Sequence, residues 1–386
     1  MSRAGNRLGF VVLAAALLSF ALGSTATAAS ENKAVYIVVL HDSVASAQAV
    51  ADEHAVKYHG KLEHVYEAAL KGYAVELHSH QAEKLAAEPQ VAYVEPDAPI
   101  VVDTTQTGAT WGLDRIDQRN RPLSGTYTYF NTGAGVKAYV IDTGIRFGHT
   151  QFGGRAISGT DKIDGGTADD CNGHGTHVAG TVGGSTYGVA KSATLVAVRV
   201  LNCNGSGTTS GVIAGVDWVT ANHGPGQPAV ANMSLGGGAS SALDTAVRNS
   251  IADGVSYAVA AGNGNFFGQA QNACNYSPAR VSEAMTISAT DSTDTKASWA
   301  NFGNCVDWFA PGVSITSAWS TSSSATRTIS GTSMATPHTA GVAALYLQGN
   351  PGASPSSLRT ALYNNTTKNI VTGTSTVNRH LLFTNY

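Results

Sequence analysis

Three residue types that together perform nucleophilic catalysis occur in separate short motifs of this 386-residue chain. Asp142 lies in Val-Ile-Asp-Thr-Gly, His174 in Asn-Gly-His-Gly-Thr-His, and Ser333 in Gly-Thr-Ser-Met-Ala. A serine hydroxyl is a weak nucleophile until a base accepts its proton, and a histidine can do so near neutral pH. A carboxylate can hold the histidine tautomer and stabilise the cation that forms. Ser333, His174 and Asp142 are therefore candidates for the nucleophile, the base and the orienting carboxylate.

The pattern around these motifs predicts a layered α/β fold that would gather them. Apolar runs predict strands at 136–141, 195–200, 230–235 and 255–260, and helices are expected near 174–183, 209–222, 240–252 and 334–348. Near-continuous apolar strands alternating with helices predict a mostly parallel central sheet flanked by helices. Functional residues of such sheets gather beyond the carboxyl ends of strands and at helix N-termini. Asp142 follows the first strand, and His174 and Ser333 are expected to open helices.

The start of the chain has the features of an export signal. Arg3 and Arg7 precede an apolar run from about Phe10 to Leu22, and Ala26-Thr27-Ala28 follows. This order predicts a secretory signal peptide over residues 1–29. A membrane anchor is the alternative, but a bilayer span needs about 18 or more apolar residues, which this run lacks. We therefore expect a secreted, extracellular protein that is not bound to a membrane.

Charge separates the next segment from the rest of the chain. Residues 31–103 contain five lysines against twelve acids, whereas residues 104–386 contain 16 basic and 14 acidic residues. The whole chain has a net charge of −3 and 13% charged residues, which excludes a broad basic surface for nucleic acid. The low charged fraction, together with 43% hydrophobic residues, also excludes a chain that is disordered because of high charge and low hydrophobicity.

The acidic segment predicts a compact α+β unit followed by an exposed linker. Strands are expected at 34–40, 72–77 and 91–94, and helices at 43–58 and 80–87. Residues 96–110 contain two prolines and then small polar residues, as linkers that are cut often do. The unit is either a removable segment or an ordinary N-terminal domain that stays attached.

The chain contains four cysteines, all beyond residue 170. An even number suits an oxidising compartment, and three pairings are possible. We favour the pairing that closes local loops, Cys171 with Cys203 and Cys274 with Cys305. The alternative is a metal site, because Cys171-x-x-His174-x-x-His177 has ligand-like spacing but lacks a second ligand pair.

The order Asp, His, Ser is the order found in subtilisin. With Trp-Gly-Leu-Asp-Arg-Ile-Asp-Gln-Arg from Trp111 and Asn-Met-Ser-Leu-Gly-Gly from Asn232, the motifs resemble the subtilisin-like serine proteases of the proteinase K branch, and among them the aqualysin-type secreted proteases. The resemblance covers the whole chain. It implies a signal peptide at 1–29, an inhibitor-type, ferredoxin-like propeptide at 30–103, and a subtilisin-like catalytic domain at 104–386. The implied function is a secreted serine endopeptidase that forms an acyl-enzyme on Ser333 and is made as a zymogen.

The resemblance also implies further site residues and partners. Asn263 matches the asparagine of the oxyanion hole, which binds the developing oxyanion together with the Ser333 N–H. Two segments match the substrate cleft: Gly205, Ser206 and Gly207, and Ser234, Leu235 and Gly236. Their glycines would let an extended peptide pair as an added strand. The implied partners are protein and peptide substrates and the chain's own propeptide as inhibitor, with the enzyme acting as a monomer.

No cofactor is expected for catalysis, but structural calcium is. One implied site uses the Asp307 carboxylate with the carbonyls of Ser282 and Ala284, and oxygen ligands of this kind suit Ca²⁺. A second, N-terminal site would use Asp114, Asp117 and Gln118. Alignment on Trp111 places the mature N-terminus near Thr104. That cut would put Asp103 in a specificity pocket that usually takes apolar residues, so cleavage after Val102 or later trimming remains open.

The chain departs from the family pattern at two places. Gly264 and the bulky Phe266-Phe267 follow Asn263 where relatives have short polar residues, and Thr339 replaces a commoner apolar residue in the serine helix.

Three other functions compete with the serine-protease interpretation. An aspartic protease would need two Asp-Thr-Gly copies, an α/β-hydrolase esterase would need Gly-x-Ser-x-Gly, and a non-catalytic binding protein would be expected to lose a catalytic residue.

Overall fold

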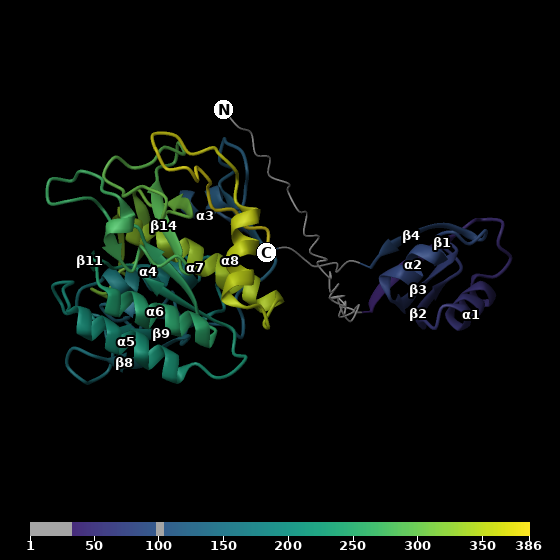
Figure 1. Cartoon of the computed structure of the whole chain (residues 1–386), viewed down its shortest axis with the longest axis horizontal. Coiled ribbons are helices and arrows are strands. Elements are labelled where there is room, and N and C mark those ends of the chain that lie inside the picture. Colours follow the sequence, from purple (N-terminus) through teal and green to yellow (C-terminus); the bar gives the residue numbers. More distant parts are fainter. Residues whose placement is uncertain (1–32, 98–103) are drawn as a thin grey trace, which may run out of the picture. The chain divides into compact units, whose positions relative to one another are not determined.

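The computed structural model describes residues 33–97 and 104–386, and the backbone divides into two units within the stretch between these ranges (Figure 1). The predicted signal peptide at residues 1–29 lies outside the described residues. In the two described ranges, no helix combines the length and the apolar character needed to cross a membrane.

The N-terminal unit is an antiparallel four-stranded sheet with two helices. Its strands pair in the order β2-β3-β1-β4, which is the order of a ferredoxin-like β-α-β-β-α-β unit. The elements are β1 (Ala34–Leu40), α1 (Ala47–Lys57), β2 (Lys61–Tyr66), β3 (Gly72–Leu77), α2 (Ser79–Leu85) and β4 (Val91–Pro96). The predicted α+β unit is confirmed. The prediction missed β2, because polar and apolar residues mix on both of its faces.

The second unit is built on a seven-stranded sheet in which every neighbouring pair is parallel. The strand order is β15-β14-β12-β10-β7-β9-β8. The strands are β7 (Lys137–Asp142), β8 (Ala156–Asp161), β9 (Thr194–Arg199), β10 (Ala229–Met233), β12 (Ser256–Ala260), β14 (Met285–Thr290) and β15 (Trp308–Pro311). The four predicted strands are confirmed to within two residues at each end. The sequence prediction missed β8, β14 and β15.

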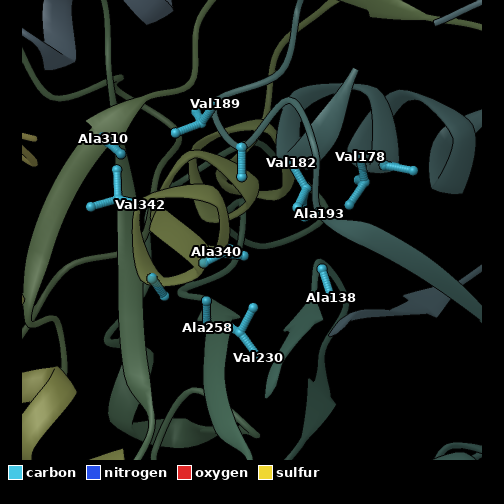
Figure 2. Packing of buried hydrophobic residues seen from close by; sticks show 14 of the residues in the cluster. Ala138, Val178, Val182, Val189, Ala193, Val230, Ala258, Ala310, Ala340 and Val342 are labelled. Carbon is cyan, nitrogen blue, oxygen red and sulfur yellow. The ribbon is translucent and has the colours of Figure 1, made fainter. Parts of the chain in front are cut away.

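Helices cover both faces of this sheet, which explains why β7 is apolar from Ala138 to Ile141. Ala138 and Val140 pack on the face that holds α4 (His174–Gly183) and α7 (Thr332–Gly349), whereas Tyr139 and Ile141 pack on the face that holds α5 (Thr209–Asn222) and α6 (Ser241–Asp253). Figure 2 shows Ala138 in the first of these cores. A strand buried on both faces loses its polar alternation.

The remaining elements surround the sheet. They are β5 (Thr104–Thr107), α3 (Trp111–Ile116), β6 (Thr126–Tyr129), β11 (Gly237–Gly238), the 3-10 turn Ala273–Asn275, β13 (Tyr276–Ser277), β16 (Ile315–Ala318), β17 (Thr326–Ile329) and α8 (Pro355–Asn365). The linker prediction for residues 96–110 is wrong over Thr104–Thr107, because β5 pairs with β6 in an antiparallel ribbon. The unusual Thr339 has a packing role: its Oγ1 accepts a hydrogen bond from the buried Trp308 indole at 3.1 Å.

Candidate active site

The three candidate catalytic residues stand at the ends of separate elements. Asp142 is the last residue of β7, His174 is the first residue of α4, and Ser333 is the second residue of α7. The carboxyl ends of parallel strands meet at one edge of a sheet, and the N-termini of the following helices lie there too. The strand end and the two helix starts that the sequence predicted are confirmed.

Asp142 and His174 are directly hydrogen-bonded. His174 Nδ1 lies 2.7 Å from Asp142 Oδ1, and the Thr143 main-chain N–H donates to the same oxygen over 2.7 Å. Burial lowers the pKa of His174, but the negative charge of Asp142, its hydrogen bond and the charge of Asp170 outweigh burial and raise that pKa above 6.5. With Nδ1 held by the carboxylate, Nε2 is left for a reacting group.

A second buried carboxylate, Asp170, holds the start of α4. Its Oδ1 accepts hydrogen bonds from Thr143 Oγ1 and the Gly173 N–H, and its Oδ2 accepts the N–H and the hydroxyl of Thr176. An anion is favourable there because the N–H groups of the first helical turn lack acceptors within the helix. Sequence reasoning missed Thr143 and Asp170. An acidic residue four positions before a helix that opens after glycine is the signal that points to Asp170.

Two glycines let α4 approach the turn after β7. Gly173, the residue before the helix, has φ = +112°, which an L side chain rarely adopts. A Cβ at Gly175 would lie only 2.2 Å from the Gly144 carbonyl oxygen. His174 therefore lies between two positions that only glycine fits. The close approach of α4 to the turn after β7 brings His174 within reach of Asp142.

Ser333 is tied to the chain segment after β10. Pro337 has no N–H, so the Ser333 carbonyl lacks its usual helical donor and instead accepts the Ser234 hydroxyl at 2.8 Å. The Ser333 hydroxyl donates to the Ser234 carbonyl at 3.0 Å. Among the hydrogen bonds of the described residues, none joins the Ser333 hydroxyl to His174. Since Ser234 lines the same cavity as His174, rotation about the Ser333 Cα–Cβ bond is the movement that would redirect the hydroxyl.

The Asn263 amide is oriented by Thr332. Its Oδ1 accepts the Thr332 N–H at 2.8 Å and the Thr332 hydroxyl at 2.9 Å, so Nδ2 faces the other way. A Cβ on Gly331 would lie 3.5 Å from the Ser333 nitrogen and 3.6 Å from Asn263 Nδ2. The two donors therefore border one small space beside Gly331. Sequence reasoning missed Thr332, although it neighbours the nucleophile candidate.

Two adjacent cavities form a cleft beside these residues. One has a volume of about 530 Å³ and contains His174 in its wall. The other has a volume of about 310 Å³ and contains Ser333 and Asn263. Residues 235–238 line both. All six residues predicted for the substrate cleft line the larger cavity: Gly205, Ser206, Gly207, Ser234, Leu235 and Gly236.

Both favoured disulfides are confirmed: Cys171 is bonded to Cys203, and Cys274 to Cys305. The alternative metal site is wrong, because Cys171 is in a disulfide and His174 Nδ1 contacts Asp142. His177 Nε2 contacts the main-chain carbonyls of Ile315 and Arg327, and burial lowers the pKa of His177 to about 4. The Cys171–Cys203 bond also ties the start of α4 to the cleft segment at Gly205.

The two expected calcium sites differ in how well their residues fit a cation. At the first, Asp307 Oδ1 pairs with the Arg359 guanidinium and Oδ2 accepts the Thr286 N–H, so its charge already has a partner. The Ser282 hydroxyl donates to Glu283. Burial nevertheless raises the pKa of Asp307 to about 6, against the effect of Arg359. The Asp307 charge is therefore already balanced by Arg359, which disfavours a divalent ion at this site.

At the second site, two carboxylates and an amide surround the segment from Ser124 to Thr128. Asp114 accepts the Ser124 and Gly125 N–H groups, and Gln118 Oε1 also accepts from Ser124. Asp117 Oδ2 accepts the Thr128 N–H, but its Oδ1 is buried without a hydrogen-bond partner. Burial and the neighbouring charge of Asp114 raise the pKa of Asp117 to about 6. An unpartnered carboxylate oxygen near a second carboxylate fits an oxygen-ligated cation.

Comparison with known proteins agrees with this geometry. Residues 133–381 match the subtilase family, and residues 35–102 match the peptidase inhibitor I9 family. The extracellular serine proteinase of Thermus sp. (strain Rt41A) is 59% identical over 83% of this chain and 77% of its own length. The alkaline serine exoprotease A of Vibrio alginolyticus is 53% identical over 85% of this chain and 61% of its own length.

A solved structure shares the fold as well. The crystal structure of a cold adapted subtilisin-like serine proteinase superposes with a TM-score of 0.69 and 56% identity, covering 72% of this chain and 98% of that one. These matches exclude the aspartic protease and α/β-hydrolase alternatives. By sequence and by fold, this chain belongs to the subtilase family of serine proteinases and has an inhibitor I9 region before its catalytic domain.

Proposed function

We propose that this subtilase is a secreted endopeptidase in which Ser333 is the nucleophile, His174 the general base and acid, Asp142 the orienting carboxylate, and Asn263 an oxyanion donor. The observation that supports it best is the 2.7 Å contact between His174 Nδ1 and Asp142, at the edge of a cleft that also contains Ser333. Secretion is supported by the predicted signal peptide and by the extracellular Thermus relative.

Peptide hydrolysis on these residues proceeds in two halves. His174 Nε2 accepts the Ser333 hydroxyl proton as Oγ attacks the peptide carbonyl carbon, and the carbonyl oxygen becomes an oxyanion held by the Ser333 N–H and Asn263 Nδ2. His174 then gives the proton to the departing amine, which leaves an ester on Ser333. Water repeats the sequence: His174 takes its proton, hydroxide attacks the ester, and Ser333 recovers its proton as the acid product leaves.

The cleft supports protein and peptide substrates that bind in an extended form. The segments around Gly205 and Gly236 line the larger cavity with little side-chain bulk, so their main chain can pair with a substrate main chain. All four proposed catalytic residues come from one chain, so the site needs no second copy to be complete. The proposal accordingly includes a monomeric enzyme.

The inhibitor I9 match covers residues 35–102, so the chain is made with an inhibitory propeptide. We propose that this propeptide spans residues 30–103 and the catalytic domain spans 104–386. The strand that begins at Thr104 supports this boundary, because β5 pairs with β6 of the catalytic domain. N-terminal sequencing of the secreted enzyme would distinguish a cut after Asp103 from one after Val102.

Covalent labelling tests the proposed nucleophile. Phenylmethylsulfonyl fluoride is expected to sulfonylate Ser333 Oγ with release of fluoride, and to abolish casein hydrolysis in the same proportion. Mass spectrometry of the peptide that contains residues 331–335 measures the adduct. Loss of activity with the adduct on another residue, or a full adduct with retained activity, would contradict the proposal.

Replacing Asn263 with aspartate removes its N–H donor and adds a negative charge beside the developing oxyanion. The variant keeps an oxygen that can accept from Thr332 but lacks the Nδ2 hydrogens, so kcat should fall about 100- to 1,000-fold with little change in KM. Steady-state kinetics on a peptide amide measure the two constants separately. A raised KM with an unchanged kcat would show that Asn263 binds the ground state instead.

Calcium is proposed at Asp114, Asp117 and Gln118, and at Asp307 it stays a prediction. Removing a cation that neutralises Asp117 should lower the melting temperature of the mature, inhibitor-blocked enzyme by roughly 5 to 10 °C. Calorimetry with and without EDTA checks this, and the melting temperature of the Asp117→Asn variant should fall less in EDTA than that of the parent. An unchanged melting temperature of the parent in EDTA would refute both calcium sites.

A further inference from the structure

Two phenylalanine side chains on the loop that follows Asn263 are largely exposed to solvent. Phe266 is 97% exposed and Phe267 is 81% exposed, and their rings stack edge to face with centroids 5.6 Å apart. Exposed aromatic side chains forgo the favourable transfer from water that burial would give. Adjacent exposed apolar residues on a soluble protein commonly mark a contact site.

The loop does not need these side chains for its shape. Asn265 O accepts the Gly268 N–H at 2.9 Å, and Asn265 Oδ1 accepts the Phe267 N–H at 3.0 Å and the Gln269 N–H at 3.1 Å. These bonds involve the main chain and Asn265, so they would survive replacement of either phenyl ring. The tip is a turn that is closed from within.

The base of the loop is also held. Asn301 Oδ1 accepts the N–H groups of Gly264 at 3.0 Å and Gln271 at 2.8 Å, which draws the two ends of the loop together. The Cys274–Cys305 disulfide follows directly. The two phenyl rings are therefore presented from a preorganised support, which lowers the entropic cost of a contact made through them.

The loop continues the wall of the proposed active-site cleft. Gly264 lines the cavity that contains Ser333 and Asn263. Phe266 follows Asn263 by three residues, so their Cα atoms lie within about 11 Å of each other. An extended substrate advances about 3.3 Å per residue, which places the phenyl rings within reach of side chains up to about four residues from the scissile bond.

We propose that Phe266 and Phe267 form an apolar subsite that selects a bulky apolar substrate side chain close to the scissile bond. This rests on the proposed function and adds to it a pair of specificity-determining residues. The contact lies outside the two cavities, so it supplements recognition of the substrate main chain. The occupant is a substrate side chain because the loop is continuous with the cleft that holds the nucleophile.

A peptide series locates the contact. Each peptide carries either Phe or Ser at one of the four positions on either side of a single cleavable bond, and kcat/KM is measured for the mature enzyme and for Phe266→Ser/Phe267→Ser. At each position, the kcat/KM of the Phe peptide is divided by that of the Ser peptide. This ratio should fall about tenfold in the variant at one or two positions and stay unchanged at the others. The Phe266→Leu/Phe267→Leu variant should keep the preference, since it keeps an apolar surface.

Phe130→Ser is the matched control, because Phe130 is 42% exposed and lies outside the cleft walls. It should leave every ratio unchanged. A uniform fall at all positions, or no change at any, would overturn the subsite. So would an unaltered peptide profile accompanied by a change in oligomeric state or in binding to phosphatidylcholine vesicles, since the occupant would then be a second copy or a lipid. An inactive parent enzyme would instead overturn the proposed function.

Discussion

Ser333→Ala is expected to lower kcat for casein and peptide hydrolysis by about a million-fold. The variant loses the oxygen that would form the acyl-enzyme, while His174 keeps its contact with Asp142 and Asn263 keeps its bonds to Thr332. The remaining rate over water would come from the oxyanion donors and from substrate binding, so KM should change little. The substitution removes one hydroxyl that donates to Ser234, and folding should be preserved.

Two measurements support this test. Circular dichroism and the melting temperature confirm that the variant is folded, and Ser324→Ala, which removes an exposed hydroxyl, should retain full activity. The variant should also accumulate with its inhibitor segment attached if the chain cuts itself. Casein hydrolysis at the parent rate by Ser333→Ala would refute the nucleophile and with it the proposed mechanism.

Asp142→Asn is expected to lower kcat by about 10,000-fold. Asp142 Oδ1 accepts two N–H groups, from Thr143 and His174, and a carboxamide oxygen can accept both. The hydrogen-bond geometry can therefore survive while the charge is lost, so the cation that forms on His174 is no longer stabilised. The amide nitrogen would take the place of Oδ2, which is buried and has no partner, and this adds a stability cost.

The pH profile separates this electrostatic role from a merely structural one. His174 must be neutral to accept the proton, so activity falls as pH drops through its pKa. In the parent, the effects of Asp142 exceed that of burial and raise the pKa of His174 above 6.5. As the pH is lowered, activity should therefore have fallen to half while the pH is still above 6.5. In Asp142→Asn, burial dominates and the acidic limb should move to lower pH.

The control for this shift is Asp217→Asn, which removes one negative charge from the exposed face of α5. It should leave the acidic limb of kcat/KM where the parent has it. The same peptide and ionic strength are used for all three proteins, since exposed charges are screened by salt. An Asp142→Asn profile that coincides with the parent profile would refute the assignment of Asp142.

Some of the fold could be predicted because local pattern and burial agree. β7 is apolar at nearly every position because both of its faces are covered, and α4 opens at His174 because Gly173 breaks the chain before it. β8 was missed because only its two ends are buried, at Ala156 and Asp161, so it lacks the continuous apolar run of a central strand. β14 was missed although it is buried throughout, because Thr and Ser lie among its apolar residues.

The supporting residues of the site were the least predictable. Asp170 bonds to Thr143 across 27 residues, and Asn301 closes the loop of Phe266 from 37 residues beyond Gly264. Ser234 reaches Ser333 across 99 residues. Polar side chains like these follow no sequence periodicity. Each forms a hydrogen bond with one particular donor or acceptor that comes within reach only after the chain has packed.

The sequence by itself determined the reaction class, because three motifs in a set order indicate a nucleophile, a base and an orienting carboxylate. It also determined the alternation of strands and helices, since periodicity and glycine turns are local properties. Only the tertiary structure decided which donors border the space beside Gly331, that the Ser333 hydroxyl donates to the Ser234 carbonyl, and that the side chains of Phe266 and Phe267 are exposed to solvent. These are distances between residues far apart in the chain, and such distances follow from how the layers pack.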